Sequence, residues 1–331
     1  MSVDDGIRDF WTWWSTARDQ LLRAIEVDHN FSDSLVQDIT RRVRAIGDLD
    51  WELSPGKTAT HAFCLSPRGN PEARLVTELW RHRGPSPDAT WEYFAARQGV
   101  QVSKLTFGNV ELDRDELMVS FEVDAGRERI DAIYYHPRFA ELPEQRRTSA
   151  LYILLDGALG EDAVERWLGR IEASPKSLAS AVSFGQFRDA LGQLERTATG
   201  DSFVVMQGTN DEGVRIVVTC NRSLKRIDHL LLTMHVAVDL AILDQTPDGM
   251  PTNAEAEVLN QLEDELIGAL GGLAVYFGRV TTPGHRALHY YAAEDTGAKP
   301  LIERWAARHP ERQPHVEWTR DPTWEFVKRF V

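Results

Sequence analysis

The fold of the C-terminal half is decided by residues 230–270, LLLTMHVAVDLAILDQTPDGMPTNAEAEVLNQLEDELIGAL. The apolar run at residues 230–242 predicts a strand, because it is continuous and ends at a turn-rich loop. Residues 253–270 predict a helix, because apolar side chains recur every four positions from Val258 to Leu270 and so share one face. A strand followed by an amphipathic helix is therefore the first part of this half.

Beyond this stretch the sequence predicts a hairpin, a helix and a last strand. Residues 273–281 and 285–292 form the hairpin, which turns at Pro283-Gly284. The helix is expected at residues 299–308 and the strand at residues 315–319. The resulting order, β-α-β-β-α-β, is the ferredoxin-like arrangement.

The preceding part of the chain shows a similar mixture of elements. Helices are predicted at residues 7–26, 32–46, 70–82, 148–159 and 184–194, and strands at residues 51–54, 60–65, 91–94, 102–107, 117–123, 130–135, 202–207 and 214–220. Residues 163–172 leave the choice of element open. The tryptophan-rich start is expected to pack against the domain rather than a membrane surface, because its polar face carries charges of both signs.

The polar segment Ser174-Pro175-Lys176-Ser177 is the best candidate for a domain border. We therefore expect an N-terminal α+β domain at residues 1–174 and a C-terminal ferredoxin-like α+β domain at residues 175–331. In both domains, antiparallel sheets are expected to be covered by helices. A chain of 331 residues is long enough for two such domains.

The two halves also share a pattern that suggests an internal repeat. Pro55-Gly56 and Pro283-Gly284 each turn a predicted hairpin, and a helix containing Trp80 or Trp305 follows at nearly the same distance. A repeated helix-strand-strand-helix-strand unit is one explanation. Coincidence between two common α+β patterns is the other.

Composition and charge restrict the function classes. Lys and Arg number 37 against 51 Asp and Glu, and the formal net charge of −14 argues against electrostatic binding of nucleic acid. No run of about 18 apolar residues occurs, so no membrane-spanning helix is expected. The N-terminus lacks the basic and apolar regions of a secretory signal, and Cys64 and Cys220 are too few for a disulfide framework. A cytoplasmic location is therefore expected, with both thiols buried.

The sequence predicts neither a metal site nor a cofactor. His285 and His289 have the spacing of zinc ligands on a helix, but on a strand they lie about 13 Å apart. Residues 244–249, DQTPDG, resemble the start of a calcium loop, yet the proline at the fourth position favours a turn. Glycine-rich phosphate loops are absent from the sequence.

Catalytic residues are equally hard to place. His235 and Asp239 are expected to share one strand face, and such a pair is able to act in general base catalysis, but no serine or cysteine in a nucleophile motif accompanies it. Cys64 and His61 are expected to point to opposite sides of a strand. If the chain is an enzyme, the candidates are His235, Asp239, His285 and Arg286.

Five short motifs stand out in the C-terminal part. They are Asp248-Gly249-Met-Pro251, Leu262-Glu263-Asp264, Gly278-Arg-Val-Thr281, His289-Tyr-Tyr291 and, as the most specific, Asp321-Pro-Thr-Trp-Glu-Phe326. With these motifs the stretch from about Phe203 to Val331 resembles the bacterial domain of unknown function 695 family. Phe10-Trp-Thr-Trp-Trp14 and Leu155-Asp-Gly-Ala-Leu-Gly-Glu161 similarly resemble an uncharacterised bacterial segment found before such domains. Because the family has no assigned reaction, the resemblance implies no catalytic residue.

These observations favour a non-enzymatic protein-binding or regulatory module. Nucleophiles, bases and metal ligands do not converge in the sequence, whereas aromatic and arginine side chains, which are common at protein interfaces, are abundant. The partner is expected to be another protein, and the acidic net charge favours a basic one. The alternative is a hydrolase whose site is assembled between the two domains. Whether the chain is an enzyme stays open, and no feature of the sequence indicates an oligomeric state.

Overall fold

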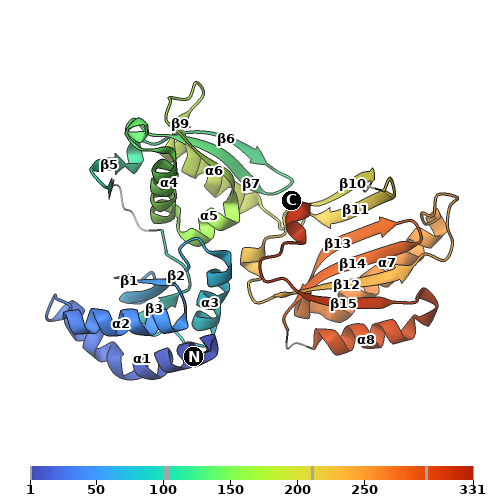
Figure 1. Ribbon diagram of the computed structural model, residues 1–331, viewed down its shortest axis with the longest axis horizontal. Helices are drawn as coiled ribbons and strands as arrows, with labels where there is room; N and C mark the ends of the chain where they lie inside the picture. Colours follow the sequence, from blue (N-terminus) through green and yellow to red (C-terminus); the bar gives the residue numbers. More distant parts are fainter. Residues whose placement is uncertain (1, 100–103, 210–211, 295–296, 331) are drawn as a thin grey trace. The chain divides into compact units, whose positions relative to one another are not determined.

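The computed structural model describes the chain in four stretches and divides it into two compact units (Figure 1). The described residues are 2–99, 104–209, 212–294 and 297–330. The first unit comprises Met1–Glu122 and Ile130–Gly192, and the second comprises Val123–Arg129 and Gln193–Val331. The border expected after residue 174 falls inside the first unit, and the expected domain bounds stay a prediction.

The N-terminal part of the first unit is a three-stranded sheet with three helices. Its elements are α1 (Val3–Glu26), α2 (Asp33–Ile46), β1 (Asp50–Pro55), β2 (His61–Ser66), α3 (Pro71–His82) and β3 (Trp91–Phe94). The sheet order is β1-β2-β3, and β1 and β2 form the predicted hairpin. β3 pairs with β2 in parallel, because α3 carries the chain back between them. The expectation of purely antiparallel sheets is therefore wrong for this part.

The tryptophan-rich start of the chain lies in the core of this part. α1 begins with a capping box, in which the side chain of Ser2 accepts from the amide of Asp5 and the carboxylate of Asp5 accepts from the amide of Ser2. Phe10 and Trp14 on the buried face of α1 pack in one cluster with Trp80 of α3. Packing of this segment against the domain is thereby confirmed.

Residues 104–197 are built around a four-stranded sheet. Their elements are β4 (Lys104–Phe107), β5 (Val110–Asp113), β6 (Met118–Asp124), β7 (Arg129–Tyr135), α4 (Glu144–Leu159), α5 (Glu161–Trp167), β8 (Leu168–Ser174), β9 (Val182–Ser183) and α6 (Phe184–Thr197). β4 and β5 form a separate hairpin, and the sheet order is β8-β7-β6-β9. β8 runs parallel to β7, because α4 and α5 connect them. Residues 163–172, for which the sequence left the type of element open, contain the end of α5 and most of β8. Residues 102 and 103 of the strand predicted at residues 102–107 lie outside the described residues.

The second unit contains a six-stranded antiparallel sheet. Its elements are β10 (Phe203–Thr209), β11 (Arg215–Asn221), β12 (Met234–Ala241), α7 (Asn253–Leu270), β13 (Ala274–Thr282), β14 (His285–Ala292), α8 (Ala298–Arg308) and β15 (His315–Arg320). The strand order is β10-β11-β13-β14-β12-β15, and every neighbouring pair is antiparallel. The strand predicted from Leu230 begins only at Met234, because Leu230 is buried outside the sheet.

The strand order does not support the predicted internal repeat. In the first unit β3 pairs directly with β2. In the second unit β12 lies between β14 and β15. The two halves therefore have the same order of elements along the chain, but their strands are arranged differently within their sheets.

Both faces of the six-stranded sheet are partly covered. On one face α7 and α8 pack over Val236, Val238 and Leu240 of β12. On the opposite face the core contains Trp324 and Val327 from the C-terminal segment. Because side chains alternate along a strand, consecutive residues of β12 and β14 face different layers.

A buried ion pair ties residues 123–129 to the rest of the second unit. Nζ of Lys225 lies 3.5 Å from Oε2 of Glu128, and both side chains are buried. The amides of Thr199 and Gly200 also donate hydrogen bonds to Glu128. Burial by itself would raise the pKa of Glu128, but these amides and Lys225 outweigh it and lower the pKa below its ordinary value.

Candidate functional site

Three of the four candidate catalytic residues lie on one face of the six-stranded sheet. His235 and Asp239 are four positions apart on β12, and Nδ1 of His285 on the neighbouring β14 lies 2.9 Å from Oδ2 of Asp239. Arg286 points to the opposite face, where its Nη1 donates to Oδ1 of Asn260 on α7 at 2.9 Å. The shared face of His235 and Asp239 is as predicted, and Arg286 is not part of this cluster.

The half-buried His235 pairs with the buried His289. Nε2 of His235 lies 3.1 Å from Nδ1 of His289, and the ring of Phe326 covers both imidazoles at centroid distances of 4.2 and 4.3 Å. Burial first, and the charge of His235 second, lower the pKa of His289 to about 3. Burial also lowers the pKa of His235. At neutral pH both rings are therefore uncharged, and one donates to the other.

The C-terminal segment that covers this pair is fixed by a second aromatic contact. The hydroxyl of Tyr291 donates to Oδ2 of Asp321 at 2.6 Å, and the ring of Trp324 stacks on Tyr291 at 4.0 Å. Burial would raise the pKa of Asp321, but hydrogen bonds from Tyr291 and two backbone amides lower it. The His289-Tyr-Tyr291 and Asp321–Phe326 motifs thus contact one another, and their composition is explained by packing.

The Asp239–His285 pair lies exposed on the same face and lacks a nucleophile. Neither side chain contacts a serine, threonine or cysteine within hydrogen-bonding distance among the described residues. In that same part of the chain, no group of three or more His, Cys, Asp or Glu is arranged to hold a metal ion. Covalent catalysis needs a hydroxyl or thiol nucleophile, and the pair contacts none among the described residues.

The carboxyl group of Asp156 in the first unit is a second candidate, which the sequence patterns did not reveal. Glu161 at the start of α5 accepts a hydrogen bond from the hydroxyl of Ser66 on β2. Burial, and then the charge of Glu161, raise the pKa of Asp156 on α4 to about 7. A carboxyl group that titrates near neutral pH is a candidate acid or base. Burial, however, raises the pKa of the nearby Cys64 thiol well above its ordinary value, so this thiol is not activated as a nucleophile.

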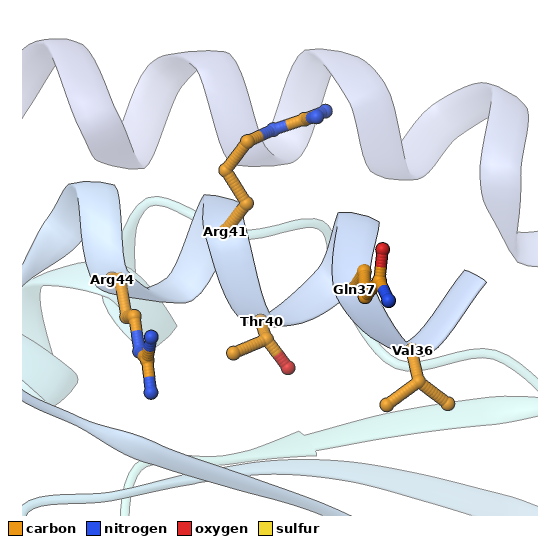
Figure 2. Close-up of a pocket in the computed structure, with 5 residues that line it drawn as sticks. All are labelled: Val36, Gln37, Thr40, Arg41 and Arg44. Atoms are coloured by element: carbon orange, nitrogen blue, oxygen red, sulfur yellow. The ribbon is translucent and has the colours of Figure 1, made fainter. Parts of the chain in front are cut away.

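A surface hollow of about 340 Å³ lies along α2. It is lined by Val36, Gln37, Thr40, Arg41 and Arg44. Figure 2 shows the side chains of Arg41 and Arg44 pointing in different directions, so they do not converge on one ligand. The hydroxyl of Thr40 is already engaged, because it accepts a hydrogen bond from the indole of Trp51.

The two edges of the six-stranded sheet differ in charge. β10 forms one edge, and its seven residues, FVVMQGT, include no charged residue and no proline. Its pairing with β11 is regular along its whole length, and Phe203 and Val205 remain 45% and 65% exposed. β15 forms the other edge and carries Glu317 and Arg320. A charged edge resists pairing with a further strand, whereas an uncharged, regular edge is open to it.

Comparison with known proteins confirms the family resemblance of the C-terminal part. Residues 204–331 match the model of DUF695, a family of unknown function. No curated protein and no solved structure matches the chain. None of the helices in the described part of the chain combines enough length and apolarity to span a bilayer.

Proposed function

We propose that the protein binds another protein by adding an extended strand of its partner to the free edge of β10. The observation that carries this proposal is the absence of charge, proline and bulge from an exposed edge strand. In this binding mode the backbone groups of the edge strand provide affinity, and alternate side chains provide specificity.

The side chains of β10 suit such a partner. Phe203 and Val205 are two positions apart and so project to one face of the sheet. The ring of Phe203 stacks on Tyr276 at 6.1 Å, which fixes one end of the edge strand. Among the described residues, none from β10 or β11 belongs to the core that α7 and α8 cover. An added strand with apolar residues at alternate positions would therefore cover Val205.

Protein binding is favoured over the hydrolase alternative on the same observations. The exposed Asp239–His285 pair is the feature that would suit a hydrolase, and it contacts no hydroxyl or thiol among the described residues. The net charge of −14 favours a basic partner during encounter. The contact with β10 itself would be apolar and backbone-mediated, because that strand carries no charge.

Two finer assignments belong to this proposal. Residues 234–320 are assigned a ferredoxin-like fold that the β10-β11 hairpin extends, and the order β13-β14-β12-β15 with α7 and α8 on one face supports it. A cytoplasmic location is supported by the two cysteines, Cys64 and Cys220, which are free and buried.

The test compares two lysine variants of the full-length protein. Val205→Lys places a charge on the free edge, and Val258→Lys places the same charge at an exposed apolar position of α7. Partners are captured from extract of the native cells and quantified by mass spectrometry, after circular dichroism has shown that both variants are folded.

We expect the wild type and Val258→Lys to capture the same protein. Val205→Lys should capture at least about tenfold less of it, the effect of about 1.4 kcal/mol in binding. Undiminished capture by Val205→Lys would overturn strand addition at β10. Failure of the wild type to capture any specific protein would overturn the binding function.

A further inference from the structure

The backbone of β10 presents hydrogen-bonding groups to the free edge at alternate residues. The carbonyl of Ser202 accepts a hydrogen bond from the amide of Arg222 at 2.9 Å, one position before the first pair of the β10–β11 register. Bonded and non-bonded positions alternate along an antiparallel pair, so the even-numbered residues of β10 bond to β11. The amides and carbonyls of the odd-numbered residues therefore point to the free edge; these residues are Phe203, Val205, Gln207 and Thr209.

This alternation makes β10 complementary to a second copy of itself. If two β10 strands pair antiparallel over all seven residues, the two-fold axis passes beside the central residue, Met206. Phe203 of one copy then lies opposite Thr209 of the other, and Val205 lies opposite Gln207. Both members of each such pair present outward backbone groups, so the whole pairing forms about eight hydrogen bonds. Each exposed backbone group of the edge thus finds its complement in the same strand.

The side chains that meet in this pairing are also compatible. Met206 faces Met206 of the second copy across the axis, and Val204 lies opposite Gly208, which has no side chain to obstruct it. Val204 and Met206 already pack against the core that contains Trp324. Self-pairing would extend this core across the axis. It places no two like charges opposite one another, because β10 carries no charge.

We propose that the strand added to β10 is β10 of a second copy of this chain, which gives a symmetric dimer with one continuous antiparallel sheet. This inference rests on the proposed strand addition and names its partner. Capture from the native cells would then recover this chain itself. A two-fold contact uses the same surface of both copies and is therefore closed. The other edge is not equivalent, because β15 carries Glu317 and Arg320.

The salt dependence separates a second copy from a basic partner. Two copies each carry a net charge of −14, so their long-range interaction is repulsive. Salt screens this repulsion beyond about 8 Å at physiological ionic strength, and the apolar, backbone-mediated contact at β10 is not weakened by that screening. The dimer should therefore strengthen as salt is added, whereas a complex with a basic protein should weaken.

Sedimentation velocity of the full-length protein, over a series of concentrations and at low and high sodium chloride, tests the proposal. We expect a reversible equilibrium between monomer and dimer that shifts toward dimer in high salt. Val205→Lys should weaken the dimer at least about tenfold, and Val258→Lys on α7 should retain it. A wild type that stays monomeric, or a dimer that Val205→Lys leaves intact, would overturn the proposal. If a monomeric wild type still captures a different protein and Val205→Lys does not, strand addition at β10 stands and only the second copy is excluded.

Cysteine cross-linking tests the position of the axis. Met206→Cys places two thiols where the opposing Cα atoms are about 4.5 Å apart, a distance that a disulfide spans. Val204→Cys is the matched control on the same face, because its two positions are more than about 13 Å apart in the dimer. The native Cys64 and Cys220 are free and buried. We expect mild oxidation to give a covalent dimer for Met206→Cys and not for Val204→Cys. Cross-linking of both variants or of neither would contradict the proposed pairing.

Discussion

Acidification from about pH 7.5 to about pH 5.5 is expected to destabilise the second unit through His289. The pKa of His289 is lowered to about 3 in the folded protein, against about 6.5 for an unfolded histidine. The unfolded chain therefore takes up a proton that the folded chain does not. The contribution of uncharged His289 to the free energy of unfolding is fully present above about pH 6.5 and is lost progressively as the pH falls toward 3.

The magnitude follows from the two pKa values. Each pH unit below about 6.5 costs about 1.4 kcal/mol for a group that stays unprotonated when folded, so His289 alone accounts for about 1.4 kcal/mol at pH 5.5. Burial also lowers the pKa of His235, so this second histidine adds to the loss of stability on acidification. Rotation of the rings away from one another is opposed by Phe326, which covers both.

Hydrogen–deuterium exchange of the β12 and β14 amides measures this loss locally. The free energy of opening is compared at the two pH values after correction for intrinsic exchange. His289→Gln should remove the pH dependence of about 1.4 kcal/mol. His285→Gln, on the same strand but exposed, should keep it. If His289→Gln loses as much stability on acidification as the wild type, the reasoning about the buried pair is refuted.

Three further predictions concern buried groups. Lys225→Met leaves the buried carboxylate of Glu128 without its cation, so the free energy of unfolding of the second unit, measured by urea titration, should fall by about 3 kcal/mol. Adding Glu128→Gln to this variant should restore part of the loss. An unchanged urea midpoint for Lys225→Met would contradict this prediction. Trp324→Ala removes a buried indole that stacks on Tyr291, so it should lower the free energy of unfolding by about 3–5 kcal/mol in the same titration. A loss below about 1 kcal/mol would show that the C-terminal segment contributes little to stability. Burial raises the pKa of the Cys64 and Cys220 thiols, so a thiol reagent should label them only after unfolding, and rapid labelling of the native protein would speak against their burial.

Elements with a strong local signal could be predicted from the sequence. β3 and β14 were predicted with their observed bounds, and turn residues precede both strands, at Pro85 and Pro87 before β3 and at Pro283-Gly284 before β14. The predicted start of β12 at Leu230 was wrong, since an apolar run reports burial and not strand pairing. The residues of α5 and β8 were undecided because helix and strand follow one another at Trp167 and Leu168 without a turn.

The candidate sites depended on contacts that no local pattern encodes. The His235–His289 contact requires β12 and β14 to be neighbours, although α7 and β13 separate them in the chain. The common face of His235 and Asp239 needed only strand alternation, and it was predicted correctly. The role of Asp321 was visible only as part of a family motif, because its partner Tyr291 comes from another strand.

The unequal edges of the six-stranded sheet also limit how large an assembly can grow. A fibre requires every subunit to present two complementary ends, so that each added subunit creates a new site for the next. In the proposed binding mode the β10 end receives a strand, while the β15 end carries Glu317 and Arg320. If strands add as proposed, growth through these edges would stop after one addition, because the charged β15 edge resists pairing with a further strand.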